Sequence, residues 1–177
     1  MSKLGGWKVQ VSTSGAPQKI ASAMNDIKLL GATYSSLAYL GSQPANGTNH
    51  AVLALQTLTT GVDTKNIVVL VFNEKPEGVT LAYIVPVVES GGAFGGTKVE
   101  PSVNIPAEAQ EALDAAKAGF VGSNIKPFLF VGTKITKGTE YKFIAEVTPV
   151  VPNAEAQVFV VTANSMTKNL SFENVLG

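Results

Sequence analysis

The sequence contains no cysteine, which excludes disulfide bonds, thiolate catalysis and cysteine-ligated metal ions. It contains a single histidine, His50, and without partner motifs a lone histidine is more often a hydrogen-bonded strand residue than a catalyst. No run of about eighteen apolar residues is present to cross a bilayer, and the first residues lack the apolar stretch of a secretory signal. We therefore expect a protein that is not an enzyme, needs no cofactor or metal, and works in the cytoplasm, with a processed secreted form as the alternative.

Charged residues are also scarce, and their signs balance. Lysine plus arginine and aspartate plus glutamate number thirteen each, so we expect neither nucleic acid nor a membrane as a partner of the whole chain. Charged residues make up 15% of the chain and apolar residues 45%, whereas about 25% charged residues is typical. This shortage of charge predicts more buried surface than one small core needs.

An internal repeat of about ninety residues organises the chain. The letters GGWKVQ at residues 5–10 return as GGTKVE at residues 95–100. From Gly31 onward several residues recur ninety-one positions later, as Gly47 does at Gly138. Changes of loop length between duplicated domains would produce such small shifts in offset. We predict two similar domains, residues 1–90 and 91–177.

Each repeat has the same predicted order of elements. A short extended segment precedes a helix that opens at Pro17 or Pro106, because proline suits the first helical turn. The first helix carries an apolar stripe at helical spacing, formed by Ile20, Met24, Ile27 and Leu30. Four strands follow in the first repeat, at residues 34–40, 48–57, 66–72 and 79–88. This pattern predicts an α+β fold in which one helix packs across an antiparallel sheet of four to five strands.

Two hairpin turns are predicted within the first repeat. Asn46 and Gly47 join two apolar segments, and this pair is typical of a type I′ turn with positive φ at both central residues. The letters NEKPEG at residues 73–78 join the last two strands, and residues 164–169 join their counterparts in the second repeat.

These residues also resemble the cystatin family, in particular its cysteine-free intracellular stefin branch. The resemblance is carried by a Gly-Gly pair, a Gln-x-x-x-Gly hairpin, a Thr-Asn-His run and a Val-Phe strand end, here Gly5, Gly6, Gln43, Gly47, Thr48, Asn49, His50, Val71 and Phe72. It implies two cystatin-like repeats and inhibition of papain-like cysteine proteases by non-covalent occlusion of the active-site cleft. The implied wedge is a trunk plus two hairpin loops, with the protease-binding residues Gly5, Gly6, Trp7, Gln43, Pro44, Ala45, Asn46, Gly47, Lys75 and Pro76.

Two departures from the family motif Gln-x-Val-x-Gly keep an alternative open. Ala45 stands where the family has valine, and in the second repeat Lys134 stands where the family has glutamine. The alternative is a non-inhibitory module for protein interaction or for structure. Binding of a small apolar ligand between helix and sheet is a further class that the sequence leaves open.

One strand face of the first repeat is more apolar than a solvent-facing surface should be. The repeat offset places Ala51, Leu53 and Leu55 on the outward face of their strand. Val68 and Leu70 share that face if the sheet keeps the same register. An apolar face of this size is typical of an interface, so we predict that it packs against the second repeat or against a second copy in a homodimer.

Overall fold

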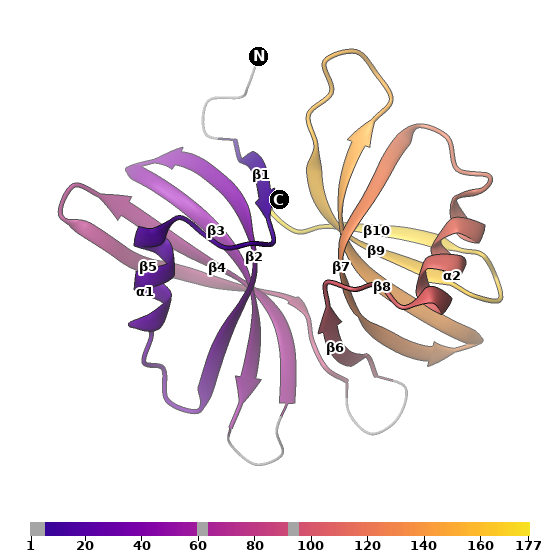
Figure 1. Cartoon of the computed structure of the whole chain (residues 1–177), viewed down its shortest axis with the longest axis horizontal. Coiled ribbons are helices and arrows are strands. Elements are labelled where there is room, and N and C mark those ends of the chain that lie inside the picture. Colours follow the sequence, from indigo (N-terminus) through magenta and orange to yellow (C-terminus); the bar gives the residue numbers. More distant parts are fainter. Residues whose placement is uncertain (1–5, 60–63, 92–95) are drawn as a thin grey trace. The chain divides into compact units, whose positions relative to one another are not determined.

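Strands dominate both halves of the chain. The computed structural model describes residues 6–59, 64–91 and 96–177, and within them the chain forms ten strands and two helices (Figure 1). The chain divides into two compact units, Met1–Val88 (unit 1) and Glu89–Gly177 (unit 2). Neither helix in these described residues is long and apolar enough to cross a membrane.

Unit 1 is one antiparallel sheet with one helix. Its elements are β1 (Lys8–Ser12), α1 (Gln18–Asn25), β2 (Ala32–Ala45), β3 (Gly47–Leu58), β4 (Thr64–Lys75) and β5 (Gly78–Val88). The strands lie in the order β1-β2-β3-β4-β5, so each strand pairs with its neighbours in sequence. The helix α1 stands in the connection between β1 and β2, and Figure 1 shows it lying against one face of the sheet.

Unit 2 repeats this order of elements. They are β6 (Lys98–Ser102), α2 (Ala107–Lys117), β7 (Ser123–Thr136), β8 (Gly138–Pro149), β9 (Gln157–Asn164) and β10 (Leu170–Asn174). The sheet order is β10-β9-β8-β7-β6. Both β7 and β8 begin and end ninety-one residues after β2 and β3, so the hairpin of unit 1 recurs in unit 2 without insertion or deletion.

Both helices begin directly after a proline. Pro17 and Pro106 occupy the N-cap positions, and their carbonyl oxygens accept the first hydrogen bonds of each helix. The helix α1 ends at Asn25 and does not continue to Leu30, because Asn25 and Asp26 are poor helix formers whose side chains compete for backbone hydrogen bonds. Leu30, predicted to be part of the buried stripe, is therefore exposed.

The helix-facing side of each sheet forms a hydrophobic core. In unit 1, Ile20 of α1 belongs to a buried cluster with Tyr39, Val52, Ala54, Val68, Leu70 and Phe72. In unit 2, the buried residues Ala109 and Leu113 of α2 cluster with Ile125, Phe130, Phe143, Ala145, Val147, Val161 and Ala163. Burying one large apolar side chain stabilises a fold by roughly 1.5–3 kcal/mol, so these clusters hold each helix on its own sheet.

The predicted α+β class, with two cystatin-like repeats, is wrong. Ten strands stand against two short helices in the described residues, which makes the fold mostly β. The two helices have only 8 and 11 residues. The strands extend past their predicted ends, since β2 has 14 residues where a strand at residues 34–40 was expected. Polar residues such as Gln43 and Asn49 pair across the hairpin and so prolong the ladder.

The predicted position of Val68 and Leu70 on the outer sheet face is also wrong. Leu70 pairs with Val52 and Val68 pairs with Ala54, and all four belong to the helix-side cluster. The residues of β4 that pair with the outer-face residues of β3 are Ile67, Val69 and Val71. Neighbouring strand residues point to opposite faces, so an error of one residue in register moves a whole set to the wrong side.

Candidate binding edge at the hairpin turns

The β2–β3 turn with its adjoining strand ends, residues 43–47, lies where the strands of the unit 1 sheet end, next to the start of β1. Lys8 of β1 pairs with Ser42 of β2, so the preceding Gly6 and Trp7 continue alongside this turn. Gly6 is exposed and Trp7 is half-buried. Backbone that carries no side chain is therefore accessible beside the turn.

The β4–β5 turn, residues 75–78, lies on the other side of the β2–β3 turn. Thr48 at the start of β3 pairs with Glu74 near the end of β4, and Lys75 pairs with Gly78 across the second turn. Three segments that are distant in sequence therefore form one row. We call this row the unit 1 edge and define it as Gly6, Trp7, residues 43–47 and residues 75–78.

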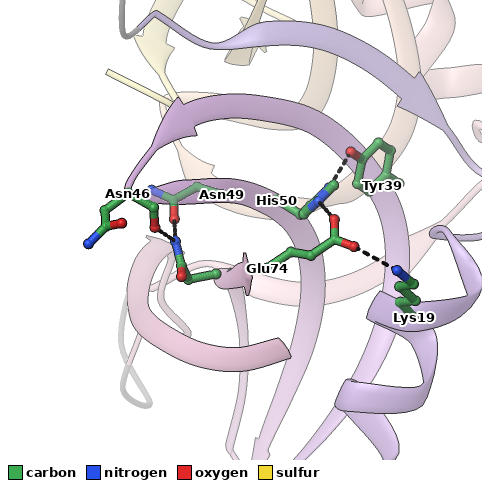
Figure 2. Close-up of polar contacts among 7 residues, drawn as sticks. Lys19, Tyr39, Asn46, Asn49, His50 and Glu74 are labelled. Carbon is green, nitrogen blue, oxygen red and sulfur yellow. Dashed lines mark hydrogen bonds and ion pairs between the residues drawn. The ribbon is translucent and has the colours of Figure 1, made fainter. Parts of the chain in front are cut away.

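Asn73 holds the two turns together. Its side-chain nitrogen Nδ2 donates to the carbonyl oxygen of Asn46 at 3.0 Å and to Oδ1 of Asn49 at 2.9 Å (Figure 2). Asn49 Nδ2 in turn donates to Gln43 Oε1 at 3.4 Å. This chain of amides joins β4 to β3 and β2, so the two turns cannot separate without losing it. We call the contacts of Asn73 the amide clamp.

Gly47 gives the first turn its tight shape. Its φ is +92°, and a Cβ at this position would collide with the carbonyl oxygen of Glu74 and lie 2.9 Å from Lys75 Cγ. Asn46 is not among the described residues with positive φ. A type I′ turn needs positive φ at both central residues, so the predicted type I′ geometry is wrong. One positive-φ glycine at the end of a short loop is typical of a G1 bulge. The absent side chain lets the two turns approach each other closely.

A second set of polar contacts joins α1 to the same edge of the sheet. Tyr39 Oη lies 2.8 Å from His50 Nδ1, and His50 Nε2 lies 2.9 Å from Glu74 Oε1 (Figure 2). The other oxygen of this carboxylate, Oε2, accepts from Lys19 Nζ at 3.3 Å. A neutral imidazole that accepts at Nδ1 and donates at Nε2 satisfies both of its contacts.

The surroundings shift the pKa of the Tyr39 phenol and that of the Glu74 carboxyl in opposite directions. Burial raises the pKa of the Tyr39 phenol above its ordinary value of 10.0, a hydrogen bond with Ser42 opposes this shift, and the charge of Glu74 adds to it. The hydrogen bond from His50 lowers the pKa of the Glu74 carboxyl, and the hydrogen bond from Lys19 lowers it further. At neutral pH the phenol therefore donates and the carboxylate accepts.

The contacts of Tyr39, His50, Glu74 and Lys19 join β2, β3, β4 and α1. Tyr39 and His50 are buried, and a phenol with a raised pKa is a poor nucleophile. In the part of the chain that the structure describes, no group of three or more His, Cys, Asp or Glu side chains could hold a metal ion. These contacts instead fix Glu74, which directly precedes the β4–β5 turn, to the helix and to β3.

Most of the predicted protease-binding residues lie together along the unit 1 edge. The exposed ones are Gly6, Pro44, Ala45, Asn46, Gly47, Lys75 and Pro76. Trp7 and Gln43 are half-buried, and Gly5 lies outside the described residues. The predicted interface residues Ala51, Leu53 and Leu55 lie on the sheet face opposite to α1, the first two fully buried and the third partly buried.

Sequence reasoning placed Asn73 and Glu74 in the predicted turn at residues 73–78 but did not predict their contacts or those of Tyr39. One signal could have found the first of them, because Asn73 recurs as Asn164 at the repeat offset. Asn164 Nδ2 donates to the carbonyl oxygen of Lys137 at 3.2 Å, and Lys137 is the counterpart of Asn46. The contact from the asparagine side chain to the carbonyl oxygen of the first turn therefore occurs in both units.

A groove of about 520 Å³ lies between α1 and the β4–β5 hairpin. Its charged lining residues are Lys19, Asp26, Glu74 and Lys75. Sites for small apolar ligands are lined mainly by apolar side chains, so this groove does not have the character of the ligand site that the sequence left open.

No protein-family model matches this chain, and no match was found among curated proteins or among solved structures. The resemblance to cystatins therefore rests on the sequence motifs alone. The geometry, exposure and charge of the unit 1 edge are the remaining indications of function.

Proposed function

We propose that the unit 1 edge binds in the active-site cleft of a papain-like cysteine protease and blocks it without forming a covalent bond. The observation that carries this proposal is the amide clamp, in which Asn73 reaches Asn46 at 3.0 Å and Asn49 at 2.9 Å. The clamp fixes two exposed turns side by side, next to Gly6 and Trp7, so that three segments present one continuous surface.

A preorganised edge suits this role because binding then orders few groups. Immobilising one flexible side chain opposes association by about 0.5–1.5 kcal/mol, and turns that are already clamped avoid part of that loss. Gly6 adds exposed backbone that a partner can approach closely, since it carries no Cβ. Occlusion of a cleft requires no chemistry from the inhibitor, in keeping with the buried and unreactive contacts of His50.

The unit 1 edge offers shape more than charge. Lys75 and Glu77 carry opposite charges in the β4–β5 turn, while Pro44, Ala45 and Asn46 of the first turn are uncharged. Recognition would then depend on the fit of backbone and small side chains in a cleft. We place the partner protease in the cytoplasm, because a cysteine-free chain suits a reducing compartment.

Titration of the full chain into a papain activity assay tests the proposal. We expect inhibition at micromolar concentration. We expect Asn73→Ala to weaken inhibition roughly ten-fold, which corresponds to about 1.4 kcal/mol, because the two turns are no longer held together. Asn164→Ala removes the equivalent clamp from unit 2 and is the matched control, so it should inhibit as the wild type does.

Two outcomes of this titration would contradict the proposal. One is the absence of inhibition by the wild type at micromolar concentration. The other is an equal loss of inhibition in Asn73→Ala and Asn164→Ala while circular dichroism shows that both variants remain folded. The second result would mean that the clamp of unit 1 has no particular part in binding.

A non-inhibitory interaction module is the second candidate. The first turn exposes only Pro44 and Ala45 as apolar side chains, which limits the apolar area that a protease cleft could bury. The same titration separates the two candidates, because a non-inhibitory module leaves papain activity unchanged at every concentration.

A further inference from the structure

The turns of unit 2 that correspond to the unit 1 edge combine exposed apolar and basic side chains. They are the β7–β8 turn, residues 134–138, and the β9–β10 loop, residues 165–169, and we call them together the unit 2 edge. Ile135 is 68% exposed and Met166 is 60% exposed. These two large apolar side chains lie mostly in solvent on adjacent turns.

Three lysines flank this apolar pair. They are Lys134, Lys137 and Lys168, and within the described ranges none of them lies in an ion pair with an acidic side chain. Glu140 stands opposite Lys134 in the β7–β8 ladder. Counting this carboxylate against the three lysines leaves the edge with a net charge of +2.

The unit 1 edge shows that the scaffold does not require this chemistry. The unit 2 positions carry Lys134, Ile135, Lys137, Met166 and Lys168 where unit 1, ninety-one residues earlier, carries Gln43, Pro44, Asn46, Lys75 and Glu77. These five positions of unit 1 have no net charge and no large apolar side chain. The two edges share one frame but differ in surface chemistry, which indicates a different ligand for unit 2.

Hydrogen bonds hold the unit 2 edge in place. Asn164 Nδ2 donates to the carbonyl oxygen of Lys137 at 3.2 Å. Its Oδ1 accepts from the backbone N–H groups of Met166 at 2.8 Å and of Thr167 at 2.9 Å. The apolar pair is therefore displayed on a frame whose backbone is fixed before any ligand binds.

We propose that the unit 2 edge docks on the surface of an anionic phospholipid bilayer. Ile135 and Met166 enter the boundary between head groups and acyl chains, and the lysines meet the lipid phosphates. A bilayer fits this edge better than a protein groove does, because apolar side chains at the ends of turns can enter a surface that deforms around them. The docking is independent of protease binding by unit 1.

The balanced charge of the whole chain predicts no attraction to a membrane, but it is not the quantity that decides docking. Attraction to an anionic surface falls off within a Debye length of about 8 Å, so the lysines nearest the lipid determine it. Each net positive charge near the lipid strengthens binding roughly five-fold, so the net charge of +2 gives roughly a 25-fold preference for anionic over neutral lipid. The expected association is weak and reversible.

Co-sedimentation of the full chain with lipid vesicles tests the proposal. One set of vesicles contains phosphatidylcholine with about a third phosphatidylserine, and the other contains phosphatidylcholine alone. We expect the wild type to sediment with the anionic vesicles only. The double variant Lys137→Gln, Lys168→Gln should lose roughly 25-fold in binding, and Ile135→Ser with Met166→Ser should lose several-fold at unchanged charge.

The matched control changes the unit 1 edge by Pro44→Ser with Lys75→Gln, and it should bind as the wild type does. Exposed turn positions tolerate such changes, and a thermal melt of each variant checks that it remains folded. No binding to anionic vesicles overturns the proposal, as does a serine double variant that binds like the wild type. Capture of the chain on polyglutamate beads but not on vesicles also overturns it and assigns the edge to an acidic protein.

Discussion

At the residue scale, asparagine has the donor and acceptor groups that a clamp between turns needs. Its side chain offers two N–H donors and a carbonyl acceptor on a short stem, so one residue can join several chain segments. The side-chain nitrogen of Asn73 donates to the β2–β3 turn and to β3. The side-chain amide of Asn164 donates through its nitrogen and accepts through its oxygen. Aspartate at either position would place an oxygen where a donor is required, against a carbonyl oxygen of the neighbouring turn.

Glu74 leads to a pH-dependent prediction at this scale. Hydrogen bonds from His50 and Lys19 hold the pKa of its carboxyl below the ordinary value of 4.5 in the folded chain. A carboxyl with a lowered folded-state pKa stabilises the fold above its unfolded-state pKa, and that contribution is lost as the pH falls through the folded-state pKa. We expect Glu74→Gln to be less stable than the wild type at neutral pH, with the difference shrinking as the pH falls below 4.5.

Urea denaturation across this pH range measures the difference for Glu74→Gln. Glu77→Gln, in the exposed β4–β5 turn, is the matched control and should unfold like the wild type at neutral pH. A stability difference for Glu74→Gln that stays constant down to strongly acidic pH would show that the ionised carboxylate contributes nothing through His50 and Lys19.

At the element scale, the first strand of each unit depends on one glycine of its partner strand. Gly41 in β2 has φ of +148°, and a Cβ there would collide with the carbonyl oxygen of Lys8 in β1. Gly132 in β7 makes the same close approach to Lys98 in β6. Each glycine lies where the strand ladder shifts register, so an added side chain would meet both strain and a collision.

Gly41→Ala should therefore weaken the pairing of β1 with β2. A non-glycine residue held in such an unfavourable backbone conformation costs about 1–3 kcal/mol, so we expect the substitution to lower the free energy of unfolding by an amount in that range. Trp7 is the single tryptophan and directly precedes β1, so its fluorescence reports the detachment of that strand. Gly132→Ala is the matched control, because it should be destabilised similarly while the fluorescence of Trp7 in the folded protein stays as in the wild type. Unchanged fluorescence in both variants would contradict the prediction.

At the scale of the whole molecule, the chain uses one frame twice and varies what the frame displays. The two units share element order, an asparagine that donates to the carbonyl oxygen of the first turn, and the close approach of a glycine to the first strand. Their edges differ in charge and in apolar content, as the pair Pro44 and Ile135 illustrates. A duplicated scaffold with divergent edges suits a protein that binds two different ligands.

The sheet face opposite to α1 leads to a prediction about the stability of the whole chain. Leu53 is fully buried on this face, together with Ala51, Val69 and Val71. A lysine at position 53 would bury an ammonium group or expel the side chain from its place, and an uncompensated buried charge costs about 3–5 kcal/mol. We expect Leu53→Lys to lower the free energy of unfolding by at least this order, measured by urea denaturation.

Leu30→Lys is the control for Leu53→Lys, because Leu30 is fully exposed and surface substitutions usually change stability by no more than about 0.5 kcal/mol. If both variants unfold at the same urea concentration as the wild type, Leu53 does not contribute to a core and the burial of this face is not what stabilises the chain.

Much of the local structure could be predicted from single positions. Pro17 and Pro106 predict the helix starts, and Gly47 marks the first turn, because backbone restriction acts on one residue at a time. The fold class could not be predicted in this way. Pairing across the hairpins prolongs the strands well past their predicted ends, and the helix α1 stops at Asn25, so the balance shifts from α+β to mostly β.

The internal repeat, the helix starts and the alternation of apolar residues can be read from spacing along the chain. The tertiary fold settled which face Val68 and Leu70 occupy, because a shift of one residue in strand register reverses every side chain. It also decided that Asn73 lies between two turns and that Glu74 meets both His50 and Lys19. Such contacts join residues far apart in sequence, and no local pattern specifies them.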